Sequence, residues 1–142
     1  QLLIEKRGQG VDALIERIEQ AAYQYPYHHE YWIWPGPNSN TFTAWISRAI
    51  PELDLDLPPT AIGKDFLGKV WVATAPSGHG WQWSMFGLLG VTVSQVEGFE
   101  LNILGLTFGI DPDPFAIKLP LIGRIDIPIL DIFTAPSTIQ EQ

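Results

Sequence analysis

A proline turn between a predicted strand and a predicted helix constrains this chain more than any other stretch. Residues 31–34, Tyr-Trp-Ile-Trp, favour a strand, whereas residues 35–37, Pro-Gly-Pro, cannot continue a ladder of backbone hydrogen bonds. Residues 38–41, Asn-Ser-Asn-Thr, carry short polar side chains that accept hydrogen bonds from free N–H groups at the start of a helix. The sequence therefore predicts a strand that ends near Trp34 and a helix that begins within residues 38–41.

Two stretches have apolar residues at spacings of three and four, which places those residues on one face of a helix. The first stretch runs from Val11 to about Tyr23, and Pro26 ends it. The second follows the proline turn and stops at Pro51. Its predicted apolar face consists of Phe42, Trp45, Ile46, Ala49 and Ile50. Both helices are expected to bury one face against the rest of the domain.

From Val70 onward, short apolar segments are separated by glycine and proline, the pattern of antiparallel strands joined by tight turns. Residues 89–93 and 104–108 look alike and are predicted to be neighbouring strands. After Ile110 the prolines are so closely spaced that we expect an extended layer that wraps the sheet rather than a central strand. The predicted fold class is α+β, with two amphipathic helices packed on a mostly antiparallel β-sheet and an extended Pro-rich C-terminal wrap.

Length and composition limit the classes of function. With 142 residues, of which 46% are hydrophobic, the chain can bury the core of a single domain over residues 1–142. A formal net charge of −8 and the absence of a basic run argue against a nucleic-acid partner. The lack of cysteine excludes disulfides, a thiolate nucleophile and a Cys-ligated metal. Because the chain lacks a start methionine and a signal-peptide pattern, we expect it to start inside a longer protein.

Ser39 is the candidate nucleophile. A helix N-terminus favours the anionic form of a hydroxyl placed there and can also stabilise an oxyanion, so Asn40 beside it is the second candidate catalytic residue. Asn38, Trp34 and Thr41 are the candidate binding residues around them. The alternative is that residues 38–40 only cap the helix, and the residue types favour this alternative because Ser and Asn are common caps.

The three histidines are candidates for a base or a metal ligand. His28 and His29 are adjacent, so on a strand they would point to opposite faces, and we predict solvated loop histidines, no metal site and no cofactor. His79 on a glycine-rich loop could reach Ser39 as a base, but we expect a solvated side chain there too. Lys64 is predicted to be a surface lysine.

Several long strings resemble an uncharacterised bacterial family, the domain of unknown function numbered 3750. They cover residues 25–42, 51–66, 87–114 and 118–125, and include the unusual WPGPNSNTF and PPTAIGKD sequences. The resemblance implies a hydrophobic export or anchor segment upstream of this chain, which would make residues 1–142 the C-terminal portion of a longer protein. It therefore implies a bacterial cell-envelope location, periplasmic or membrane-anchored, with anchoring through that upstream segment.

Residues 38–42, Asn-Ser-Asn-Thr-Phe, are also similar to the helix start of circularly permuted papain-like folds of the NlpC and lecithin-retinol-acyltransferase type. That motif has an Asn-Cys-x-x-Phe-like pattern, and Ser39 occupies its Cys position. No histidine lies at the expected place upstream in this chain. Because a hydroxyl needs an adjacent base, the resemblance implies either a base from an upstream segment or an inactive site.

Two functions stay open from the sequence. The first is an envelope hydrolase or acyltransferase that acts on an amide or ester with Ser39 as nucleophile. The second is a catalytically inactive binding or structural module of the same fold, whose aromatic surface holds a small-molecule, peptide or lipid ligand. A serine-reactive fluorophosphonate would distinguish them, since only the first predicts labelling of Ser39.

Overall fold

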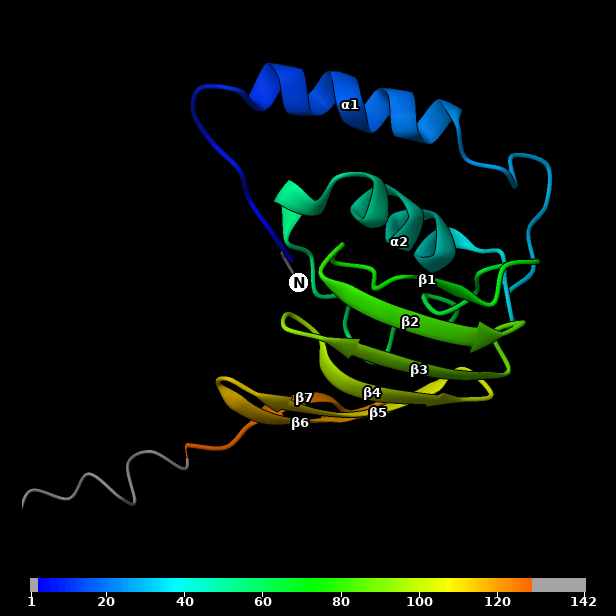
Figure 1. Ribbon diagram of the computed structural model, residues 1–142, viewed down its shortest axis with the longest axis vertical. Coiled ribbons are helices and arrows are strands. Elements are labelled where there is room, and N and C mark those ends of the chain that lie inside the picture. Colours follow the sequence, from blue (N-terminus) through cyan, green and yellow to red (C-terminus); the bar gives the residue numbers. More distant parts are fainter. Residues whose placement is uncertain (1–2, 129–142) are drawn as a thin grey trace, which may run out of the picture.

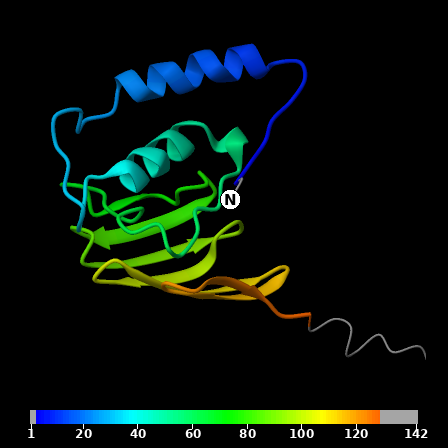
Figure 2. The same ribbon diagram turned by 180° about the vertical axis from the view of Figure 1, so that it is seen from behind.

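The computed structural model describes residues 3–128 (Figures 1 and 2). Its helices are α1 (Val11–Tyr23) and α2 (Ser39–Ala49), and a short 3-10 helix, η1 (Pro51–Leu53), follows α2. The strands are β1 (Val72–Thr74), β2 (Gly80–Met85), β3 (Leu89–Ser94), β4 (Gly98–Ile103), β5 (Leu106–Pro112), β6 (Phe115–Leu119) and β7 (Gly123–Asp126). The predicted α+β class is confirmed, with two helices and an antiparallel sheet.

The seven strands form one antiparallel meander in chain order, each strand paired with the next. Helix α1 is outermost, and α2 lies between α1 and the β1 end of the sheet in both views (Figures 1 and 2). The long irregular segment between η1 and β1 lies against the inner face of the sheet, where Lys64 contacts Glu100 of β4. The sheet therefore has one face covered by the chain and one face turned outward.

A small apolar core joins the two helices to the segment after η1. Trp45 Nε1 donates a hydrogen bond of 2.8 Å to the carbonyl of Ala21, which ties α2 to the end of α1. Leu53, Leu55 and Leu57 alternate with Asp54 and Asp56 along the chain, and all three leucines are buried. The buried members of this core are Ala21, Ala44, Ile46, Ile50, Leu53, Leu55, Leu57 and Ala61.

The sheet is inverted, because its polar face is buried and its apolar face is turned to solvent. Gln82, Thr92, Glu100 and Lys118 lie in one row across the inner face, and each is at most 1% exposed. Half-buried antiparallel sheets ordinarily turn their apolar side to the core. We call the outward side the apolar face; it consists of Trp81, Trp83, Val91, Val93, Phe99, Leu101, Ile103, Leu106, Phe108, Ile110, Ile117 and Ile125.

The predicted strand at residues 31–34 is wrong. These residues form an exposed bend, and the backbone N–H of Trp32 donates to the carbonyl of Pro37 at 2.8 Å. The segment thus folds back on its own proline turn instead of joining the sheet. The predicted apolar face of α2 is also shifted, since Phe42 and Ala49 are exposed while Thr41 and Ser47 are buried.

The predicted extended wrap is also wrong for residues 115–126, because these residues contain β6 and β7, which belong to the sheet. The prolines fall at strand ends and turns, where a missing N–H costs little: Pro112 ends β5, and Pro120 lies in the turn before β7. The end of the predicted wrap lies outside the described residues. Residues 89–93 and 104–108 are not neighbours either, since β4 lies between β3 and β5.

Within residues 3–128, no helix combines the length and the apolar composition that a membrane span requires.

Candidate functional site

The polar motif at the start of α2 forms a reciprocal cap. Asn38 is the N-cap residue, and its Oδ1 accepts hydrogen bonds from the backbone N–H groups of Asn40 at 2.9 Å and Thr41 at 3.1 Å. In return, the Thr41 hydroxyl accepts from the backbone N–H of Asn38 at 3.2 Å. This arrangement is a capping box, which satisfies N–H groups that have no partner inside the helix.

The same motif also fastens α2 to the loop at residues 62–63. Asn38 Nδ2 and Asn40 Nδ2 both donate to the carbonyl of Ile62, at 3.0 and 2.9 Å, and the Thr41 hydroxyl donates to the carbonyl of Gly63 at 2.8 Å. Gly63 has a φ of +88°, and a Cβ there would lie 2.5 Å from Asn38 Nδ2. The Asn-Ser-Asn-Thr motif therefore has a structural role at Asn38, Asn40 and Thr41.

Ser39 is exposed in the first turn of α2. It borders a hollow of about 500 Å³ together with His28, His29 and Glu30. In the part of the chain that the structure describes, its hydroxyl forms no hydrogen bond with a histidine: His28 Nε2 contacts the carbonyl of Tyr23 at 3.0 Å. His79 borders a different hollow, beside Ser94. The candidate nucleophile thus has no histidine hydrogen-bonded to it among the described residues.

The remaining predicted binding residue, Trp34, is half-exposed, and its Nε1 donates a hydrogen bond of 2.9 Å to the carbonyl of Leu104 in the turn between β4 and β5. Gly105 in the same turn has a φ of +84°, and a Cβ there would lie 3.0 Å from the Trp34 indole. Trp34 therefore fastens the proline turn to the sheet.

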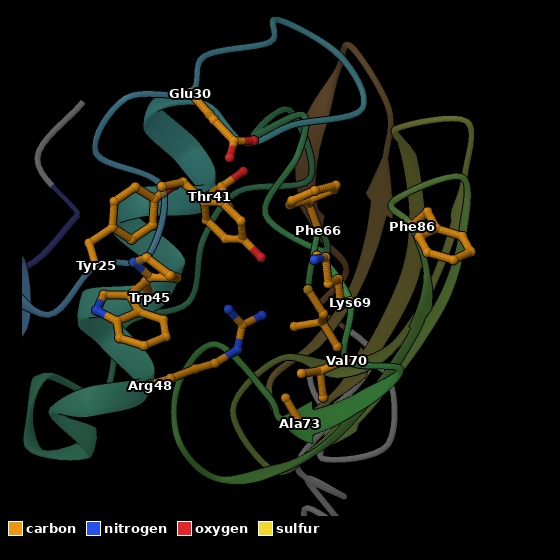
Figure 3. Close-up of a pocket in the computed structure, with 14 residues that line it drawn as sticks. Tyr25, Glu30, Thr41, Trp45, Arg48, Phe66, Lys69, Val70, Ala73 and Phe86 are labelled. Atoms are coloured by element: carbon orange, nitrogen blue, oxygen red, sulfur yellow. The ribbon is translucent and has the colours of Figure 1, made fainter.

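An aromatic cavity of about 720 Å³ lies between α2 and the segment that leads into β1 (Figure 3). Thr41, Trp45 and Arg48 line it from α2, while Ala73 lines it from β1. We call it the aromatic cavity; its other lining residues are Tyr25, Pro26, Tyr27, Glu30, Phe66, Leu67, Gly68, Lys69, Val70 and Phe86. A cavity of this size matches those that hold small molecules.

The aromatic rings of the cavity meet edge to face. Tyr25 packs against Tyr27, with ring centroids 5.6 Å apart, and against Trp45 at 6.0 Å. Tyr27 also packs against Phe66 at 5.8 Å. Edge-to-face pairs at these distances stabilise each other beyond their buried area, so the wall is a connected set of rigid rings.

Arg48 brings a positive charge into this apolar space. Its Nε donates to the carbonyl of Thr74 at 3.0 Å, and its Nη2 donates to the carbonyl of Lys64 and to Gln82 Oε1. Within residues 3–128 its Nη1 has no hydrogen-bond partner. Burial lowers the pKa of Arg48 to about 10, although Glu97 and Asp65 oppose this shift. Arg48 therefore stays protonated at neutral pH. Its Nε and Nη2 are bound to the protein, while its Nη1 can donate hydrogen bonds to a ligand.

Glu30 and Arg48 point into the cavity from opposite ends (Figure 3). The pKa of Tyr27 is raised by burial and by the nearby Glu30, so its hydroxyl stays protonated at neutral pH and keeps a proton to donate. Gly68, with a φ of +65°, leaves room for that hydroxyl, because a Cβ there would lie 1.6 Å from the Tyr27 oxygen. The cavity thus has a cationic end, an acidic end and an apolar wall between them.

A second group of charges is buried under the sheet. Glu100 accepts from Lys64 Nζ and from Lys118 Nζ, at 3.0 and 3.1 Å, and Lys118 also pairs with Asp56 at 2.8 Å. Burial opposes the charged form of Lys118, but Glu100 and Asp56 outweigh it and raise the pKa of this lysine. The prediction of a surface lysine at position 64 is wrong, since Lys64 is 1% exposed. These opposite charges compensate one another, and their ion pairs hold the segment after η1 against the sheet.

Asp65 lies beside this charged group and is also buried. Its pKa is raised to about 6 by burial, against the lowering effects of its backbone hydrogen bond, Lys64 and Arg48. Its Oδ2 has no hydrogen-bond partner among the described residues, and the same holds for Ser47 Oγ, Gln82 Nε2, Thr92 Oγ1 and Asn102 Nδ2. Glu100 Oε2 also lacks a partner with hydrogen-bond geometry, but it lies 2.8 Å from Lys64 Nζ as an ion pair. The described residues contain no cluster of three His, Asp or Glu side chains suited to a metal ion.

Sequence reasoning missed most of the aromatic cavity. Trp45 appeared as a core residue, Arg48 was not singled out, and Tyr27 and Phe66 come from segments without periodicity. One signal was available, because Arg48 lies three residues after Trp45 and seven after Thr41, so all three fall on one face of a helix. The helical spacing could have indicated a cation on an aromatic face.

Residues 1–66 match the model of the family described as Protein of unknown function (DUF3750). The matched part includes α1, the proline turn, α2 and the residue pair Lys64 and Asp65. No curated protein and no solved structure matches the chain. The similarity to papain-like folds gains no support from these comparisons.

Proposed function

We propose that this domain is a binding module whose aromatic cavity holds a small molecule that combines a flat apolar part with an anionic group. The observation that carries the proposal is Arg48, whose guanidinium enters an aromatic cavity with Nη1 free of partners in the described part of the chain. An arginine with one free edge binds carboxylates and phosphates through charge-assisted hydrogen bonds.

The cavity wall suits the apolar part of such a ligand. Trp45, Tyr25 and Phe66 present ring edges and faces, on which a flat or unsaturated molecule packs well. The volume of the cavity falls within the range of about 300–1,000 Å³ that is typical of pockets for drug-sized ligands.

The charges define the orientation of the ligand. Its anionic group lies at the Arg48 end, because Glu30 at the opposite end repels a negative charge. Lys69 also lines the cavity and adds a second cation for the anionic group. A neutral or cationic ligand leaves the Arg48 guanidinium with an unused donor edge and therefore binds less tightly.

A hydrolase or acyltransferase with Ser39 as nucleophile is the second candidate function, and its permuted papain-like fold and cell-envelope location belong to the same proposal. The observation in its favour is the exposed Ser39 at a helix N-terminus, beside a hollow bordered by His28 and His29. A fluorophosphonate labels Ser39 in this case and does not label the Ser39→Ala variant. Absence of labelling in the wild type leaves the binding module as the function.

The binding site is tested by filling the cavity from β1. Ala73 lines the cavity, whereas Val72 beside it on the same strand does not and is 51% exposed. We expect Ala73→Phe to abolish binding of 1-naphthoate in isothermal titration calorimetry, because the added ring occupies the space of the ligand. The matched control Val72→Phe should keep wild-type affinity. Equal loss in both variants, or none in either, would contradict the location of the site.

A further inference from the structure

The apolar face of the sheet contains a continuous apolar row that crosses six strands. The row runs through Trp81, Val93, Phe99, Ile110, Ile117 and Ile125, each paired in register with the next. Trp81 is 70% exposed, and Val93, Phe99 and Ile110 are at least 50% exposed. A second row, Trp83, Val91, Leu101 and Phe108, lies beside it. Large apolar side chains thus form an uninterrupted surface.

This surface is large for one copy of a small domain. Strands β2–β7 cover roughly 29 by 20 Å, taking about 4.8 Å between strands and about 3.3 Å per residue. That projection of about 600 Å² is a lower bound on the accessible area, because side chains also expose their flanks, and the largest apolar patch of a typical monomer is about 300–600 Å². A standard interface buries about 800 Å² on each partner, so a projection of about 600 Å² is of the size that a dimer interface needs once the exposed flanks of the side chains are counted.

The charges of the domain are placed elsewhere. No outward position of β2–β6 carries a charged residue, since Glu100, Asp111 and Lys118 are all buried on the inner face. Exposed charges lie instead on α1, for example Asp12, Glu16 and Glu19, at the opposite end of the molecule from the sheet (Figure 1). A partner for this face therefore needs no complementary charge, only an apolar surface of similar size.

We propose that the apolar face is the interface of a homodimer in which two copies pack sheet against sheet. A second copy presents an apolar face of the same area. A two-fold contact between two identical faces gives a closed dimer and leaves neither face exposed to bind a third copy. Stacked sheets pack about 10 Å apart with their side chains interdigitated, which suits the alternating large and β-branched residues of the two rows.

A lipid bilayer suits this face less well than a second copy. The sheet is open, and the outer edges of β1 and β7 have no strand partner among the described residues. Backbone N–H and C=O groups at such edges find no partner in hydrocarbon, whereas they stay in water at the rim of a dimer.

The proposal is tested by sedimentation equilibrium of the chain over a range of micromolar concentrations. The expected mass is twice the 15.9 kDa of one chain. Val93→Lys with Ile110→Lys places charges in the middle of the first row, at positions already half-exposed, and should halve the mass with an unchanged circular dichroism spectrum. Ile15→Lys, at a 48% exposed position on α1, is the matched control and should stay dimeric.

A wild-type chain that is monomeric over the whole concentration range overturns the dimer, whatever the variants do. Flotation with phosphatidylcholine vesicles is measured in parallel. A monomer that floats with the vesicles, and no longer floats after the two lysine substitutions, assigns the face to lipid instead. A dimer that persists in the double-lysine variant while Ile15→Lys breaks it assigns the interface to α1 and also overturns the proposal.

Discussion

Lys64 Nζ lies 2.8 Å from Glu100 Oε2, and both side chains are at most 1% exposed. The pair joins the irregular segment after η1 to the middle of the sheet, and Lys118 approaches the same carboxylate from β6. Burying three charges is costly unless they compensate one another, so this group favours the one arrangement in which all three meet.

Glu100→Gln should destabilise the domain by about 3–5 kcal/mol, because it leaves the buried Lys64 ammonium without a carboxylate partner and leaves Lys118 with Asp56 alone. The measurement is the free energy of unfolding from urea titrations. Glu52→Gln is the matched control, since Glu52 pairs with Arg17 on the surface, and its unfolding free energy should stay close to that of the wild type. Similar values for both variants would show that the buried pair contributes no more than a surface pair.

Asn38→Ala should cost about 2 kcal/mol of unfolding free energy, since it removes the helix cap and the hydrogen bond to Ile62 together. Ser39→Ala, one residue later, should change the stability by less than about 0.5 kcal/mol because the Ser39 side chain is exposed. Thermal unfolding monitored by circular dichroism gives both values. A larger effect at Ser39 than at Asn38 would contradict the assignment of the cap.

Asp65 should make the domain less stable as the pH rises, whereas an ordinary ion-paired carboxylate makes a protein more stable as the pH rises. Its pKa in the folded protein is raised to about 6 by burial, so between about pH 4 and 6 the folded state binds more protons than the unfolded state. Stability due to this group therefore falls as the pH rises through that window. Asp65→Asn should be more stable than the wild type at pH 8 and should lose the advantage near pH 4. Urea titrations at both pH values measure this, and an equal difference at both would contradict it.

The helices could be predicted from the sequence because their apolar spacing is local, and α1 begins and ends where the pattern places it. The face of the sheet that is buried could not be predicted. Apolar and polar residues alternate along β4 in the order Phe99-Glu100-Leu101-Asn102, so the two faces of the sheet differ. In most half-buried antiparallel sheets the apolar face packs on the core. Here the reverse holds, because Glu100 finds Lys64 and Lys118 from segments far away in the chain.

The strand expected at residues 31–34 shows the same limit. Strand propensity reflects packing against neighbouring strands, and this segment has none because Trp34 is bound to the turn at Leu104. At the candidate site, the cap residues could be predicted from residue type, since Ser and Asn at a helix start accept hydrogen bonds from nearby backbone N–H groups. The aromatic cavity could not be predicted in this way, because its wall joins four segments that only the tertiary fold brings together.

The central claim is that Arg48 binds an anionic group inside the aromatic cavity. Its most direct test compares two ligands of nearly identical shape, 1-naphthoate and the neutral 1-naphthamide, by isothermal titration calorimetry with the wild-type chain. A charge-assisted hydrogen bond contributes about 1.5–3 kcal/mol, so the carboxylate should bind at least about tenfold more tightly than the amide. Equal affinities, or tighter binding of the amide, would contradict the role of Arg48.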